Sequence, residues 1–153
     1  KAGLGCRTMV RVVEVNGYQI KAGAHLVRAK LAGASLNRAR LDEANLFEAN
    51  LTDANLTRAQ LSKANLFGAN LTGANLTNAD LSRAQLSNAN LRGANLTNAD
   101  LSRAQLSHTN LFEANLTGAF LFETNLRGAY LFKADLTGAN LTGTTMPDGS
   151  IHD

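Results

Sequence analysis

Residues 69–83 read ANLTGANLTNADLSR, so the unit Ala-(Asn/Asp)-Leu-x-x returns every five residues. The same register extends from Leu26 to Leu141, which places twenty-four consecutive Leu residues at every fifth position. Ala stands two positions before the Leu in twenty-two of these units, and Thr109 and Thr124 replace it in the other two. A repeat this regular indicates that one repetitive unit fills most of the 153 residues.

A five-residue period fits neither an α-helix nor a flat strand. At about 100° per residue, a helix would distribute the Leu side chains around its whole circumference, and no apolar stripe would form. In a flat strand the odd spacing would send successive Leu side chains to opposite faces. The chain must therefore turn once per unit. Four right-angled turns would close one coil and point every Leu toward a common axis.

Repetition over a longer distance favours four sides per coil. Residues 76–87, LTNADLSRAQLS, recur unchanged as residues 96–107, an offset of 20. Phe112 and Phe132 repeat the same offset. An internal duplication would also account for part of this pattern. With four sides, residues 20 apart should stack on successive coils.

The Ala-Asn-Leu-x-x run resembles the pentapeptide-repeat family over residues 22–146. Its ending, Met146-Pro147-Asp148-Gly149, is similar to that of cyanobacterial members. The resemblance implies an all-β fold, a right-handed four-sided parallel β-helix of about six coils. It also implies that Leu and Ala lie inside, while the residue before Leu and the two after it face out. The expected structural core includes Leu46, Leu66, Leu86, Leu106 and Leu126.

The two flanks are expected to complete the rod. Residues 1–21 contain MVRVVEVNGYQI, in which Asn16-Gly17 predicts a type I′ hairpin that caps the open first coil. Residues 22–146 form the solenoid. Residues 147–153 form a turn and tail, from which Ile151 is expected to close the last coil.

The formal net charge of +3 is unevenly distributed. Residues 1–40 contain eight Lys/Arg and one acid, a balance of +7, whereas residues 41–153 contain seven Lys/Arg and eleven acids, a balance of −4. A basic end could meet an acidic protein, a nucleic acid or a membrane surface, or could simply keep the chain soluble. The candidate basic patch contains Arg11, Lys21, Arg28, Lys30, Arg38, Arg40 and Arg58.

Aromatic residues gather at outward positions in the C-terminal third of the repeat. A cluster near one end is what self-association or a partner surface requires, although a stack can also simply stabilise neighbouring coils. The candidate partner or dimer surface contains Phe112, Phe120, Phe122, Tyr130 and Phe132.

No catalytic or cofactor-binding set emerges from the outward positions. The three histidines are far apart in register, and Cys6 has no second cysteine with which to form a disulfide or a metal site. We therefore expect no enzymatic activity, no cofactor and no metal. The column Glu43, Lys63, Arg83, Arg103 and Glu123 predicts a solvated ion-pair network.

The leading functional hypothesis is a non-catalytic scaffold that binds a protein partner, with a homodimer through the C-terminal end as one form of it. The alternative implied by the resemblance is a DNA mimic that binds and protects gyrase, which the positive net charge disfavours. Direct nucleic-acid binding is a less favoured hypothesis, and a regular Thr column raises ice binding as another. No membrane insertion is expected, and the cytoplasm is the expected compartment.

Overall fold

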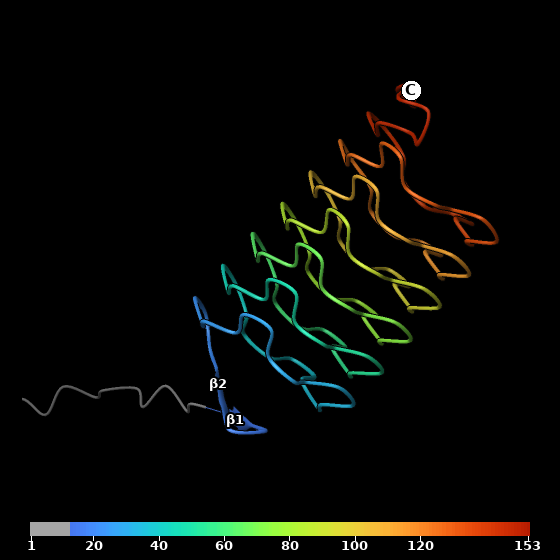
Figure 1. The fold of residues 1–153 in the computed structure, drawn as a ribbon. Coiled ribbons are helices and arrows are strands. Elements are labelled where there is room, and N and C mark those ends of the chain that lie inside the picture. The colour runs from blue at the N-terminus through green and yellow to red at the C-terminus, as the bar shows by residue number, and fades with distance from the viewer. Residues whose placement is uncertain (1–12) are drawn as a thin grey trace, which may run out of the picture.

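A computed structural model describes residues 13–153, so Cys6 and Arg11 lie outside the described residues. Two short strands, β1 (Val13–Val15) and β2 (Tyr18–Ile20), precede a long stack of coils (Figure 1). They pair antiparallel across Asn16 and Gly17, whose φ angles are 52° and 79°. Two positive φ angles define the type I′ turn, so the hairpin prediction is confirmed.

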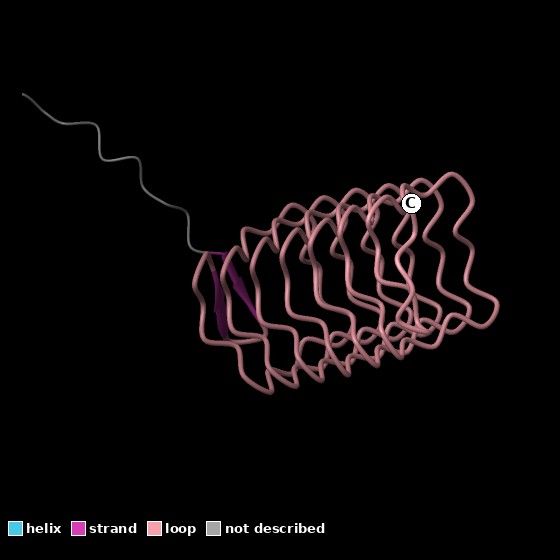
Figure 2. Ribbon diagram, turned by 90° about the horizontal axis from the view of Figure 1, so that it is seen from above, coloured by secondary structure: helices cyan, strands magenta, loops and turns pink. Residues whose placement is uncertain are grey.

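The coils have four sides. Each side contributes one residue that pairs with the residue 20 positions later, as His25 does with Asn45 and Lys30 with Asn50. The pairing is parallel and continues along the rod to Thr145. Figure 2 shows the resulting row of similar loops stacked along one axis. The prediction of a four-sided parallel β-helix is confirmed.

A tight turn forms each corner. The Ala44 N–H donates to the Leu41 carbonyl at 3.0 Å, and this bond recurs in the other units. The second residue after each Leu from Leu26 to Leu141 has a φ between 52° and 70°. Glycine takes such angles freely, which explains Gly73 and Gly93, whereas Arg or Glu at a corner costs roughly 1 kcal/mol. Coil packing outweighs this local preference.

Asn side chains support the corners from outside the coil. The Asn75 Oδ1 accepts hydrogen bonds from the Thr77 N–H at 3.1 Å and from the Thr77 hydroxyl at 2.7 Å. This local turn satisfies a backbone donor that the coil-to-coil bonds leave unused. Asn or Asp before Leu is therefore a structural part of the repeat.

Leu and Ala fill the interior. Every Leu of the repeat from Leu26 to Leu126 is at most 2% exposed. Thr109 and Thr124, which replace Ala, are also buried and donate to the carbonyls of Leu86 and Leu101 at 2.8 and 2.7 Å. Within residues 13–153 no buried side-chain polar atom lacks a partner. The five core Leu residues named from the sequence all lie in this interior: Leu46, Leu66, Leu86, Leu106 and Leu126.

The hairpin covers part of the first coil. Ile20 is 5% exposed and belongs to the core cluster. The Tyr18 hydroxyl accepts a hydrogen bond from the Lys30 N–H at 3.2 Å, and Asn16 Nδ2 donates to the Lys30 carbonyl at 3.3 Å. Strand-edge groups of one side of the coil are thus satisfied by the hairpin.

Within residues 13–153 the last coil remains uncovered. Leu131, Leu136 and Leu141 are only half-buried. The expectation that Ile151 closes this coil is wrong, because its side chain is 59% exposed. The tail instead lies along one side, where the Gly143 N–H donates to the His152 carbonyl at 2.7 Å. Backbone hydrogen bonds hold the tail at the rim of the last coil, and no other described residue covers the apolar end of the stack.

Candidate functional site

Three aromatic rings form a stack on one side of the last two coils. The ring centroids of Phe112 and Phe132 are 6.0 Å apart with an interplanar angle of 16°, and Tyr130 lies 6.0 Å from Phe112 and 6.3 Å from Phe132. Tyr130 and Phe132 are 54% and 57% exposed. The stack therefore presents a large apolar area to solvent.

Cations border this aromatic stack. The Arg92 guanidinium lies 5.0 Å from the centre of the Phe112 ring. Lys133 Nζ lies 5.6 Å from the same ring and 3.2 Å from Glu113 Oε1. Rings with charged neighbours form the mixed surface that protein interfaces commonly use.

Phe120 and Phe122 belong to a different side of the rod, the one that contains Leu121. Phe120 is 51% exposed, and the Arg103 guanidinium lies 5.8 Å from the Phe122 ring. Arg103 Nε also pairs with Glu123 Oε2 at 2.7 Å. The five aromatic residues singled out in the sequence thus form two groups, and only Phe112, Tyr130 and Phe132 stack together.

The open coil beside the aromatic stack offers backbone hydrogen-bonding groups. In the preceding coils the backbone amides equivalent to those of Leu131, Leu136 and Leu141 donate to carbonyls of the following coil, as the Leu111 N–H does to the Tyr130 carbonyl. In the last coil these three N–H groups have no backbone acceptor within residues 13–153. We define the C-terminal surface as Phe112, Tyr130, Phe132, Leu131, Leu136 and Leu141. Its Leu members could not be recognised from the repeat, because every unit contains the same Leu.

The basic residues lie at the opposite end of the rod. Arg28 Nε pairs with Glu48 Oε2 at 2.7 Å, so its charge is locally balanced. The other described members are exposed, and none has a carboxylate of residues 13–153 within 4.0 Å. These unpaired cations are Lys21, Lys30, Arg38, Arg40 and Arg58.

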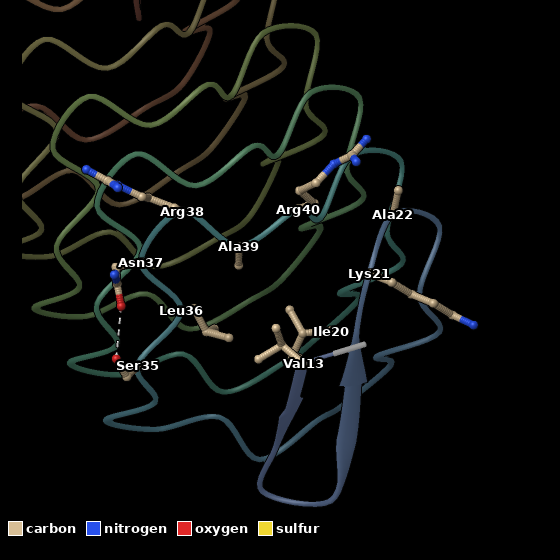
Figure 3. A pocket seen from close by; sticks show the side chains of 10 residues that line it. All are labelled: Val13, Ile20, Lys21, Ala22, Ser35, Leu36, Asn37, Arg38, Ala39 and Arg40. Atoms are coloured by element: carbon tan, nitrogen blue, oxygen red, sulfur yellow. Dashed lines mark hydrogen bonds between the residues drawn. The ribbon is translucent and has the colours of Figure 1, made fainter. Parts of the chain in front are cut away.

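A hollow of about 500 Å³ lies between the hairpin and the first coil (Figure 3). The side chains of Val13, Ile20 and Leu36 point toward one another, and Lys21 and Arg40 extend outward around them. A second hollow, lined by Asn37, Arg38, Asn55, Thr57, Arg58 and Asn78, adjoins the first because both include Asn37 and Arg38. We call these two adjoining hollows the N-terminal groove. The sequence did not indicate this groove, since its shape depends on where the hairpin packs.

The remaining polar groups of residues 13–153 include ion pairs and the hydrogen bonds at the corners. No group of three metal-ligating side chains occurs within residues 13–153. The predicted ion-pair column forms two separate pairs, Lys63–Glu43 at 3.4 Å and Arg103–Glu123 at 2.7 Å, and Arg83 has no carboxylate of residues 13–153 within 4.0 Å. Hydrogen bonds from the Thr137 hydroxyl and N–H hold the pKa of Asp135 below its usual value. That carboxylate supports a corner of the coil.

Comparison with protein-family models gives a match over most of the repeat. The family model for pentapeptide repeats matches residues 24–62, 44–83, 79–118 and 109–146. No curated protein matches the chain. No helix among the described residues has the length and apolar character needed to span a membrane.

Three solved structures illustrate the similarity. HetL, a pentapeptide repeat protein involved in heterocyst differentiation regulation from the cyanobacterium Nostoc sp. strain PCC 7120, is 36% identical; the match covers 86% of this chain and 78% of HetL, with a TM-score of 0.43. Rfr23 from the cyanobacterium Cyanothece 51142 is 32% identical, with coverages of 68% and 64% and a TM-score of 0.41. A thylakoid-lumen protein of Arabidopsis thaliana is 29% identical, with coverages of 80% and 72% and a TM-score of 0.30.

Proposed function

This chain belongs to the pentapeptide-repeat family, whose fold is a right-handed β-helix, and we propose that it acts as a non-catalytic scaffold that binds a protein through its C-terminal surface. The observation that carries the proposal is the joining of an exposed aromatic stack to an uncovered apolar coil end. Under a bound partner the rings would become buried aromatic anchors and the Leu side chains a desolvated centre, the two features that protein interfaces require.

Backbone groups favour a protein partner over a small ligand. Beside the free amides of Leu131, Leu136 and Leu141, the carbonyls of Ala134 and Ala139 accept no backbone hydrogen bond from residues 13–153. Donors and acceptors alternate along this rim as they do along a strand edge. An incoming strand or coil could pair with them while covering the Leu side chains.

A second copy of this chain is the first partner to test. It would present the same aromatic stack and the same alternating rim, so a two-fold arrangement could bury both open ends at once. Such a contact would also remove the exposed edge that otherwise invites uncontrolled stacking of rods.

Light scattering coupled to gel filtration tests the proposal. The double variant Tyr130→Ser/Phe132→Ser removes the two most exposed rings of the stack. The matched control Phe47→Ser/Phe67→Ser removes another stacked pair, 5.7 Å apart, far from the C-terminal end. We expect a concentration-dependent dimer that is lost in the first variant and retained in the control. If both double variants form the dimer to the same extent, the C-terminal surface does not mediate dimerisation and the proposal fails.

A monomeric wild-type protein would direct the search to a different protein. Affinity capture from the native host would then compare the wild type with the same two double variants. Recovery of one protein by the wild type and the control, but not by Tyr130→Ser/Phe132→Ser, supports the scaffold. Cell fractionation with an antibody to the chain tests the cytoplasmic location expected from the sequence.

A further inference from the structure

The N-terminal end contains an unpaired strand edge beside the 500 Å³ hollow. In the next coil the Asn55 N–H donates to the Ala34 carbonyl, and the Gln60 N–H to the Ala39 carbonyl, each within 2.9 Å. The corresponding residues one coil closer to the N-terminus are Ser35 and Arg40. Neither N–H has an acceptor within residues 13–153, and the Asn37 carbonyl has no backbone donor there. The hairpin therefore satisfies the Lys30 side of this coil and leaves open the two following sides, which contain Ser35 and Arg40 and meet at the Asn37–Arg38 corner.

Apolar side chains form the floor of the hollow next to this edge. Ile20 and Leu36 are buried at 5% and 2% exposure, and Val13 forms the outer wall at 53%. A side chain of Leu or Val size that entered here would be desolvated on three sides. A peptide that followed this bent edge, as residues 55–60 do one coil further along, would direct a side chain toward this floor.

Charge on both sides of the hollow has a single sign. Lys21, Arg38 and Arg40 line it, and the adjoining hollow adds Arg58. No acidic side chain of residues 13–153 lines either hollow, and none of these cations has a carboxylate of the same residues within 4.0 Å. Arginine pairs strongly with carboxylates in such a setting. The occupant should therefore be acidic.

We propose that this groove binds an acidic peptide segment of a partner protein. The peptide backbone pairs with the open edge at Ser35 and Arg40 and turns with it at the Asn37–Arg38 corner. One Leu- or Val-sized side chain enters between Val13, Ile20 and Leu36, and flanking carboxylates meet Arg38 and Arg58. Backbone bonds supply affinity, and the side chain in the hollow and the carboxylates supply selectivity. This site is independent of the C-terminal surface, so the two can be tested separately.

Fluorescence anisotropy with the full chain tests the proposal. The probe is a fluorescein-labelled heptapeptide, Glu-Leu-Glu-Val-Glu-Leu-Glu. Two matched peptides replace Glu by Lys or methylate alternate backbone nitrogens. We expect binding of the first peptide only, because the second reverses the charge and the third loses the donors needed for edge pairing.

Charge-reversal variants locate the binding site. Arg38→Glu/Arg58→Glu should weaken binding of the acidic peptide by about tenfold or more, and Val13→Ser should also weaken it. Arg83→Glu is the matched control, since Arg83 is an exposed corner residue on another side of the rod. It should change the affinity by less than about twofold. Circular dichroism verifies that each variant retains the fold.

Three results would overturn the proposal. The first is an affinity that does not respond to Arg38→Glu/Arg58→Glu or to N-methylation. The second is binding of a single-stranded oligonucleotide or an anionic lipid vesicle, sensitive to the same variants, without binding of the peptide. The third is peptide binding that appears only when Met9 and Val10 are replaced by Ser, because the chain's own N-terminal segment would then be the occupant.

Discussion

Leu31 in the first coil and Leu131 in the last occupy the same column of the same side, yet Leu31 is fully buried and Leu131 is half-exposed. The first coil has a hairpin that contributes Ile20 and Tyr18 to its end, whereas the last coil has only a tail along one side. A solenoid buries a repeat only where a neighbour stacks on it. The difference shows that position in the stack, and not residue type, sets the exposure of a repeat Leu.

Truncating these two Leu residues should produce the largest contrast. Leu31→Ala should lower the free energy of unfolding by about 3–5 kcal/mol, because a cavity remains in a closed core. Leu131→Ala should cost only about 1–2 kcal/mol, since its side chain already contacts solvent. Urea denaturation of the Leu31→Ala and Leu131→Ala variants measures the two losses in unfolding free energy, with Leu91→Ala as the mid-rod reference. Equal losses at Leu31 and Leu131 would mean that the two ends are closed alike.

Removing single hydroxyl groups tests the polar closure of each end. Tyr18→Phe removes the acceptor for the Lys30 N–H and should cost about 1 kcal/mol. Thr144 is buried and donates to the Leu121 carbonyl at 2.5 Å, so Thr144→Val should cost a similar amount. Thermal unfolding of both variants checks this. A neutral Tyr18→Phe would show that the hairpin does not close the strand edge in solution.

Corner glycines provide a smaller and more local contrast. Gly93 and Gly138 have φ angles of 63° and 69°, and an added Cβ would meet no atom within 4 Å at either position. Gly93→Ala should therefore cost about 1 kcal/mol through backbone strain alone. Gly138→Ala should cost less, because the open last coil can fray. Chemical denaturation distinguishes them, and a larger loss at Gly138 would argue against fraying.

The smallest effect concerns pH at the open end. Because the folded-state pKa of Asp135 is lowered by its hydrogen bonds from Thr137, its contribution to stability is present above the unfolded pKa. It is lost as the pH falls below about 4. Asp135→Asn keeps an acceptor oxygen and should flatten this part of the acid limb. An unchanged slope of stability against pH below 4 would show that the Thr137 bonds are broken in solution.

The repeat predicted the rod because both depend on the same five-residue period. Leu, Ala and the Asn-Gly turn each have one favourable placement, so the four sides, the interior and the hairpin followed from the sequence. The exposure of the ends did not follow from the sequence, since Leu136 has the same neighbours in sequence as a buried Leu. Ile151 was misplaced because backbone pairing of the tail outweighed the burial of one side chain. The N-terminal groove depends on hairpin packing, which no repeat encodes.

The central claim is that the C-terminal end is an open surface that closes on a protein partner. Hydrogen exchange of the Leu131, Leu136 and Leu141 amides tests it most directly, with Leu31, Leu36 and Leu41 as the reference set. We predict rapid exchange of the first set in the dilute monomer, slow exchange of the reference set, and protection of the first set on dimer formation or partner binding. Slow exchange of both sets in the monomer, or no added protection on association, would contradict the claim.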